Sequence, residues 1–310
     1  MIPSEILTSS FLEAGIGCFG IVGEDRFREA CSAMPTALRE RLGLGGAAGA
    51  IAVALAYGEG PEAAQLSAAM PSFRDCPGPK ARLARFARAD WYGELAARLK
   101  DAAARIRARL REEGRDPWPA REWRYFVNSG LPEKRLALEA GLGRLGRHGL
   151  VMLPGHGSAA VLGVLVLPPD AATAAEPVAA GDARRLSPSC GQCAKCVAAC
   201  PTGALAPDGG FARELCLQHW SSIPGALPAP VEAAWGDRLY GCDACQEACP
   251  LFSPDAAAST LRGRLGPGLP AAWLVSAPES EIRSTLRGTV LGMRWIAIDA
   301  LRRNAGMALR

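Results

Sequence analysis

Eight of the eleven cysteines lie between residues 190 and 249 of this 310-residue chain, and they constrain its fold more than any other feature. They form two runs with one cysteine between the runs: Cys190, Cys193, Cys196 and Cys200; then Cys216; then Cys242, Cys245 and Cys249. A proline follows the last cysteine of each run. The first residues do not resemble a secretory signal peptide, which argues against a disulfide framework and in favour of bound metal.

The first run has the spacing C-x2-C-x2-C-x3-C-P. This spacing is typical of bacterial ferredoxins, in which the fourth cysteine of one run binds the other cluster. The pattern therefore predicts two [4Fe–4S] clusters, with ligands Cys190, Cys193, Cys196 and Cys249 for the first and Cys200, Cys216, Cys242 and Cys245 for the second. Two structural zinc sites are the alternative, but zinc ribbons use paired C-x2-C knuckles without this third and fourth cysteine.

Composition and length set broader limits. Hydrophobic residues make up 49% and charged residues 21% of the chain, which is typical of a globular protein. The formal net charge of +4 allows a polyanionic partner without requiring one. No apolar stretch approaches the ~20 residues of a membrane-spanning helix, so we expect no membrane association and a cytoplasmic location. A monomer is compatible with the sequence. Cys18, Cys31 and Cys76 are expected to be buried free thiols.

Hydrophobic patterns predict three segments. Residues 1–180 alternate between strand-like and helix-like patterns and should form an α/β or α+β domain. Within it we expect helices at 5–14 (capped by Ser4), 80–111 and 133–140, and strands at 51–57, 123–127 and 159–167. A linker covers 168–188. Residues 181–254 should form a ferredoxin-like domain, and residues 255–310 a helical C-terminal segment that ends in an amphipathic helix at 294–309.

Motifs outside the first cysteine run add a more specific indication. They are an apolar run at 50–57, the segments Phe86-Ala87-Arg88-Ala89-Asp90-Trp91-Tyr92 and Glu139-Ala140-Gly141-Leu142-Gly143-Arg144-Leu145-Gly146-Arg147-His148, the segment Tyr240-Gly241-Cys242-Asp243-Ala244-Cys245-Gln246, and the closing Arg302-Arg303-Asn304-Ala305. In this order, together with the cysteines, they resemble the epoxyqueuosine reductase family, which performs the last step of queuosine synthesis in tRNA.

The resemblance implies an oxidoreductase with a cobalamin bound base-off between the N-terminal domain and the cluster domain. The N-terminal domain would bind the cobalamin, and the cluster domain would transfer the electrons. An external donor of the flavodoxin or ferredoxin type would supply electrons, which would pass through the clusters to cobalt to remove an epoxide oxygen from a tRNA base. The cobalamin contacts that it implies are Tyr57, Asn128, Gly141, Gly143, Gly146 and His148. Plain loop glycines and a structural hydrogen-bonding histidine are the alternatives for four of these positions.

Several positions depart from the family pattern. Asn128 stands where the family has the aspartate understood as its proton donor, and an asparagine has no ionisable proton. Trp91-Tyr92 replaces a Tyr-His pair, Arg144 replaces a tryptophan, and Val164 replaces a glutamate. Together these changes favour a pocket rebuilt for another substrate. The alternatives are therefore a reductase of a small molecule, akin to reductive dehalogenases, and a two-cluster electron carrier without cobalamin.

Residues 80–124 contain thirteen Lys and Arg against seven Asp and Glu. A solvated helix face explains this excess as well as RNA binding does, so a tRNA partner rests on the resemblance.

Overall fold

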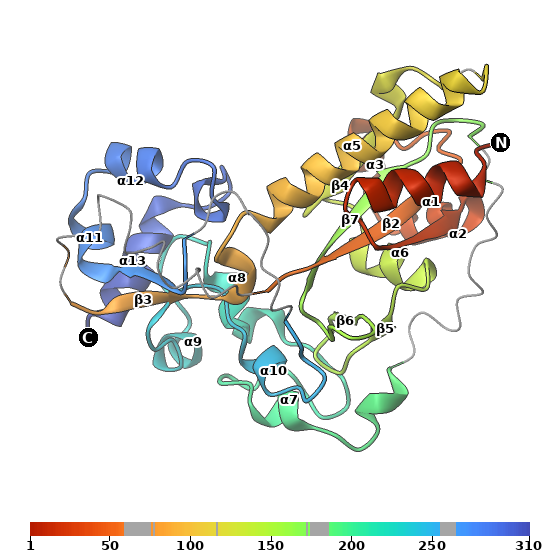
Figure 1. Cartoon of the computed structure of the whole chain (residues 1–310). Coiled ribbons are helices and arrows are strands. Elements are labelled where there is room, and N and C mark those ends of the chain that lie inside the picture. Colours follow the sequence, from red (N-terminus) through yellow and green to blue (C-terminus); the bar gives the residue numbers. More distant parts are fainter. Residues whose placement is uncertain (59–75, 77, 116, 172, 174–185, 255–264) are drawn as a thin grey trace. The chain divides into compact units, whose positions relative to one another are not determined.

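The structure is a computed structural model of the chain (Figure 1). It describes all residues except 59–75, 77, 116, 172, 174–185 and 255–264. The chain divides into two compact units. The first contains Met1–Ala56, Tyr92–Gly146 and Leu150–Ser187, and the second contains Tyr57–Trp91, Arg147–Gly149 and Pro188–Arg310. Among the described helices, none combines the length and the apolar character needed to span a membrane.

The first unit is built on a four-stranded sheet with the order β1-β2-β7-β4. The strands are β1 (Cys18–Gly23), β2 (Gly49–Ala56), β4 (Arg124–Val127) and β7 (Ala160–Val166). Every neighbouring pair is antiparallel, so the unit is α+β. The three strands predicted from apolar runs are confirmed within a few residues, and β1 was not predicted. The central strands β2 and β7 are almost wholly buried, as expected of continuous apolar runs.

Helices cover both faces of this sheet. The helices of this unit are α1 (Ser4–Glu13), α2 (Glu24–Cys31), α5 (Trp91–Glu112) and α6 (Glu133–Glu139), together with the short α3 (Thr36–Arg41), which has no buried residue. Helices α2 and α6 share a buried core with Ala52 and Val164 on one face. Helix α5 lies against the other face, where a Cβ built on Gly163 would meet Leu95 and Leu99 at 3.0 Å. Gly163 therefore lets the long helix approach the middle of the sheet.

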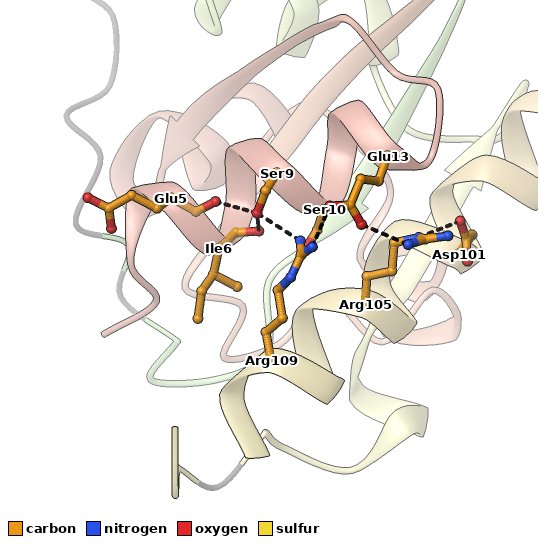
Figure 2. Close-up of polar contacts among 8 residues, drawn as sticks. All are labelled: Glu5, Ile6, Ser9, Ser10, Glu13, Asp101, Arg105 and Arg109. Carbon is orange, nitrogen blue, oxygen red and sulfur yellow. Dashed lines mark hydrogen bonds and ion pairs between the residues drawn. The ribbon is translucent and has the colours of Figure 1, made fainter. Parts of the chain in front are cut away.

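Helix α1 is joined to α5 by polar side chains (Figure 2). The carboxylate of Glu13 accepts from Nη1 of Arg105 at 2.8 Å and from Nη2 of Arg109 at 2.6 Å. Nη1 of Arg109 also donates to the Ser10 hydroxyl at 2.9 Å, and Nε of Arg105 donates to Asp101 at 2.8 Å. These two arginines, counted in the basic excess of residues 80–124, are thus engaged within the unit.

Two of the predicted helix features are wrong in detail. The first helix begins at Ser4 itself, and its N-cap is Pro3 without a side-chain hydrogen bond, so Ser4 is not the cap. The helix predicted at 80–111 begins only at Trp91. Its first residues instead form strand β3 (Lys80–Leu83), because they pair with strands from a distant part of the chain. The helices predicted at 5–14 and 133–140 are confirmed.

The second unit contains a three-stranded sheet with the order β8-β3-β9. Its further elements are α7 (Lys195–Ala198), α8 (Leu217–Trp220), α9 (Ala229–Ala233), β8 (Arg238–Tyr240), α10 (Ala244–Glu247), β9 (Gly268–Pro270), α11 (Ala271–Ser276), α12 (Glu279–Thr285) and α13 (Ile298–Ala308). The two-stranded hairpin of β5 (Arg144–Leu145) and β6 (Val151–Met152) belongs to the first unit. The predicted helical C-terminal segment is confirmed, with its last helix starting later than expected.

Helix α13 is fixed to the second unit by two adjacent residues. The fully buried Asn304 donates through Nδ2 to the carbonyls of Ser221 and Leu239 at 2.9 and 2.7 Å. The Arg303 guanidinium donates to the carbonyls of Trp220, Ile223 and Gly225 at 2.7 to 2.8 Å. The closing Arg-Asn pair of the sequence therefore holds the chain that follows Cys216.

The unit boundaries differ from the three consecutive segments predicted from the sequence. Tyr57–Trp91 and Arg147–Gly149 group with the cysteine-rich segment, and so do the C-terminal helices. The predicted linker at 168–188 falls largely outside the described residues.

Candidate functional site

Seven of the eight clustered cysteines have neighbouring thiols, which fall mainly into two groups. In the first group, burial raises the pKa of the Cys196 thiol, and the nearby thiolates of Cys190 and Cys249 raise it further. Cys193 is linked to Cys190 through the backbone of a turn, in which its N–H donates to the Cys190 carbonyl at 2.7 Å. The first group thus combines cysteines of the first run with the last cysteine of the second run.

The second group surrounds Cys245. Burial raises the pKa of this thiol to about 12, and the thiolates of Cys242, Cys216 and Cys200 add to the shift, with Cys196 contributing least. Cys245 therefore lies near three cysteines predicted to share its cluster and also near Cys196, which is predicted to bind the other cluster. Helices α7 and α10 pack together and bring the two cysteine runs side by side.

Backbone N–H groups donate to three of these sulfurs, those of Cys196, Cys200 and Cys216. Burial alone would raise the pKa of Cys200, but N–H groups of Leu205, Thr202 and Ala204 donate to its sulfur and lower the pKa overall. N–H groups that follow Cys216 act on its thiol in the same way, although burial keeps the pKa of that thiol raised. Since the thiolate is the form that binds metal, such donors favour ligation.

The spacing within the groups bears on which metal they fit. Within the described part of the chain, no three His, Cys, Asp or Glu side chains lie close enough to bind one common metal ion. Thiolates are soft donors that suit both zinc and iron–sulfur clusters. The choice of a [4Fe–4S] cluster therefore rests on the C-x2-C-x2-C-x3-C-P order of the first cysteine run.

The first thiol group has a further support from Arg147. Its guanidinium donates to the Gly191 carbonyl at 2.8 Å and to the Pro207 carbonyl at 2.7 Å. Gly191 lies between Cys190 and Cys193, so Arg147 ties this cysteine loop to the hairpin that follows the first run. The sequence motif contained Arg147, but nothing in its spacing indicated this contact.

The residues predicted to contact cobalamin are distributed over both units. Tyr57 and His148 belong to the second unit, and the other four belong to the first. The buried hydroxyl of Tyr57 donates to Oε1 of Gln246 at 2.8 Å, and its ring lies 6.1 Å from that of Trp91. Gln246 lies between two cysteines, so Tyr57 supports the cysteine-rich turn.

Chain geometry accounts for the three glycines. Gly141 ends α6 with a φ of 72°, a left-handed conformation that glycine favours. A Cβ on Gly143 would lie only 2.2 Å from the Met152 carbonyl oxygen in the β5–β6 hairpin. The N–H of Gly146 donates to the Leu150 carbonyl at 2.8 Å. These contacts explain the motif without a ligand and leave a corrin contact as a prediction.

His148 is buried, with 7% of its surface exposed, and burial lowers its pKa to about 4. Its imidazole is therefore neutral near pH 7 and cannot act there as a cationic acid. This environment agrees with the structural alternative considered for His148.

Asn128 is exposed at the end of β4 and has a φ of 49°. The next residue, Ser129, donates through both N–H and hydroxyl to one carboxylate oxygen of Glu133, at 2.7 and 2.9 Å. The Leu131 N–H donates in turn to the Ser129 hydroxyl at 3.0 Å. Glu133 thus holds the Asn128 loop, and sequence reasoning missed it. A serine shortly before an acidic residue at a helix start was the available signal.

Comparisons with known proteins support a double-cluster domain in the cysteine-rich segment. A family model described as "4Fe-4S double cluster binding domain" matches residues 189–251. The epoxyqueuosine reductase of Bacillus anthracis is 31% identical over 212 residues, which cover 67% of this chain and 49% of the relative. The chain therefore spans about half the length of this curated relative, and the predicted resemblance is confirmed at the level of sequence similarity.

Solved structures of epoxyqueuosine reductases share the fold. The Bacillus subtilis enzyme, with its aspartate-bearing catalytic loop swung out of the active site, aligns with a TM-score of 0.70, 23% identity, and coverage of 98% of this chain and 80% of its own. An epoxyqueuosine reductase bound to a modified tRNA stem loop aligns with a TM-score of 0.68 and 22% identity over the same shares of the two chains. At these identities the likeness establishes the fold, and the predicted fold class is confirmed.

Proposed function

We propose that this chain is an iron–sulfur oxidoreductase of the epoxyqueuosine reductase type, which passes electrons through two [4Fe–4S] clusters to a cobalamin. The observation that carries the proposal is that α7 and α10 bring the two cysteine runs side by side, with Cys196 near Cys249 and Cys245 near Cys200 and Cys216. The match of residues 189–251 to a double-cluster domain supports it.

The proposed ligands follow the two thiol groups. They are Cys190, Cys193, Cys196 and Cys249 for the first cluster and Cys200, Cys216, Cys242 and Cys245 for the second. The N–H groups aimed at Cys200 and Cys216 would then hydrogen-bond to cluster sulfur. Such bonds favour the reduced, more negative cluster.

The cobalamin is proposed on the shared fold and on Asn128. The Asn128 amide is exposed and can both donate and accept a hydrogen bond, so it fits a contact with a polar ligand. Tyr57 and the glycines have internal contacts that need no ligand. Bound cobalamin would supply the reducing centre that acts on the substrate. The chain's own residues would hold the ligand and exclude water.

Removal of an epoxide oxygen as water consumes two electrons and two protons. Asn128 cannot deliver either proton near pH 7, because its amide does not ionise. Its role in this chain would be to orient the ligand or substrate by hydrogen bonding. We expect the protons to come from water or from the substrate itself.

A queuosine precursor in tRNA is the substrate that we propose, because a structural neighbour binds a tRNA stem loop carrying epoxyqueuosine. The electrons would come from an external carrier of the flavodoxin or ferredoxin type.

The replacement of the family's aspartate by Asn128 favours a second candidate, reduction of a small molecule on the same scaffold. The internal contacts of Tyr57 and the glycines favour a third, a two-cluster electron carrier without cobalamin.

Turnover by the whole chain tests the proposal. The protein would be purified without oxygen, supplied with iron, sulfide and cobalamin, reduced chemically, and mixed with a stem loop that carries epoxyqueuosine. We expect mass spectrometry of the digested nucleosides to detect queuosine only when cobalamin is present. Cys245→Ala should abolish this conversion, whereas Cys18→Ala, which removes a thiol outside both groups, should retain it.

Asn128→Asp separates the candidates. A gain in conversion over the unmodified chain would support a diverged tRNA enzyme. If neither protein converts the stem loop while both clusters and cobalamin are bound, the tRNA substrate is contradicted and the small-molecule reductase is favoured. If the clusters assemble and cobalamin does not bind, the electron carrier is favoured.

A further inference from the structure

Within the second unit, residues 84–88, here called the anchor segment, lie against residues 240–247, here called the ligand turn. The ligand turn contains Cys242 and Cys245, both proposed ligands of the second cluster. The anchor segment contains no cysteine and lies far from the turn in the sequence. The cluster ligands themselves do not explain what the anchor segment does.

Backbone contacts hold the two segments together. The Ala84 N–H donates to the Tyr240 carbonyl at 2.9 Å. The Arg85 N–H donates to Oδ2 of Asp243 at 2.7 Å, across 158 positions of sequence. Gly241 has a φ of 86°, and a Cβ there would lie 2.4 Å from that of Ala84. The anchor segment therefore fixes the backbone that presents Cys242 and Cys245.

The same contact places two positive and two negative charges together. Nε of Arg85 lies 3.4 Å from Oε1 of Glu247. Arg88 is half-buried, its Nε donates to the Leu83 carbonyl at 3.0 Å, and it interacts electrostatically with Asp243 and Glu247. Asp243 is buried, with 5% of its surface exposed. Glu247 is thus paired with the Arg85 side chain, and Asp243 accepts the Arg85 N–H with the Arg88 charge nearby.

We propose that Arg88, together with Arg85, is a positioning residue for the second cluster. The two arginines balance the carboxylates beside the ligand turn and thereby raise the reduction potential of that cluster. The inference rests on the proposed function, because it requires the second cluster to bind at this turn.

The physical reason is the charge of the reduced cluster. A cluster becomes more negative by one charge when it takes up an electron, so nearby positive charge stabilises the reduced form. Partly buried charges are screened less by salt and water than exposed ones. Without the Arg88 charge, only Arg85 would offset Asp243 and Glu247, and the added electron of the reduced cluster would be less stabilised.

A redox titration of the whole reconstituted chain, followed by EPR, tests this role. Arg88→Gln should make reduction of one of the two clusters about tenfold less favourable, which is 59 mV for one electron, and leave the other unchanged. Arg88→Lys should titrate close to the unmodified protein, because it keeps the charge while losing the planar donor. Arg82→Gln is the control, because Arg82 lies on neighbouring β3 but pairs with Asp237 at 3.1 Å near the surface. It should shift neither potential.

Unchanged potentials in Arg88→Gln, with both clusters bound, would overturn the inference. So would an equal shift in Arg88→Lys, because a structural role would then explain both variants. If the Arg88→Gln protein does not bind the second cluster, the Arg85→Gln protein is titrated instead. In that variant the N–H of residue 85 can still donate to Asp243. The same tenfold shift is expected there, and unchanged potentials would overturn the inference. Failure of the unmodified chain to bind two clusters would instead refute the proposed function.

Discussion

Asn128 has a left-handed backbone that most side chains avoid, with a φ of 49°. Asn and Asp tolerate this region better than other non-glycine residues. Asn128→Asp should therefore leave the free energy of unfolding nearly unchanged, whereas Asn128→Ala should lower it by about 1–2 kcal/mol. Denaturant unfolding of the two variants checks this. An alanine variant as stable as the unmodified chain would contradict the strained loop.

Glu133 makes the same loop sensitive to pH. Burial raises the pKa of Glu133 above its ordinary value of 4.5, although hydrogen bonds from Ser129 oppose the shift. The contribution of a raised carboxyl pKa to stability is fully present below the unfolded-state pKa and is lost as the pH rises through the folded-state pKa. Glu133→Gln keeps an acceptor for Ser129 but cannot ionise. It should lose less stability than the unmodified protein as the pH rises above the ordinary carboxyl pKa of 4.5.

Denaturant midpoints across this pH range measure the effect of Glu133→Gln. Parallel pH profiles for the two proteins would contradict a buried, ionising Glu133.

Single residues differ in how far the sequence predicts them. The grouping of the cysteines was predicted from the ferredoxin pattern, in which the fourth cysteine of one run binds the other cluster, with Cys216 completing the second set. The roles of Glu133 and Arg88 depend instead on where the backbone carries them. Tyr57 was predicted to contact a cofactor, and its hydroxyl bonds to Gln246, a partner 189 positions away that no local pattern indicates.

Helix α13 depends on Asn304, whose buried side chain donates to two backbone carbonyls. Asn304→Ala would leave these carbonyls without their partner and should lower the free energy of unfolding by about 2 kcal/mol or more. Gly306→Ala is the matched control on the same helix, because a Cβ there meets nothing within 4 Å. It should be neutral or stabilising. Thermal unfolding of both variants checks this, and a tolerated Asn304→Ala would contradict the role of the amide.

Elements with local signals were predicted best. The buried strands β2 and β7 and the helices α1 and α6 follow from apolar periodicity. Strand β3 was mistaken for the start of α5, because its alternation of basic and apolar residues also fits a helix and its partners β8 and β9 come much later in the chain. Its position matters for function, since β3 leads directly into the anchor segment.

The whole molecule shares its fold with epoxyqueuosine reductases and spans about half the length of the curated relative it matches. Its partner is therefore a proposal that solution binding can test. If the chain binds tRNA through phosphate contacts, the affinity should fall steeply as salt is raised from about 50 to about 200 mM. Fluorescence anisotropy with a labelled stem loop measures this dependence. A flat salt response would argue against a tRNA partner and favour the small-molecule candidate.

The most direct test of the central claim is metal analysis combined with EPR on the anaerobically reconstituted chain in the presence of cobalamin. Two clusters predict about eight iron atoms per chain and two reduced [4Fe–4S] signals. A base-off cob(II)alamin signal in stoichiometric amount should accompany them. Zinc in place of iron, or a single cluster, would contradict the assignment of the eight cysteines. Two intact clusters with cobalamin left free in solution would contradict the cobalamin-dependent reductase and leave the electron carrier.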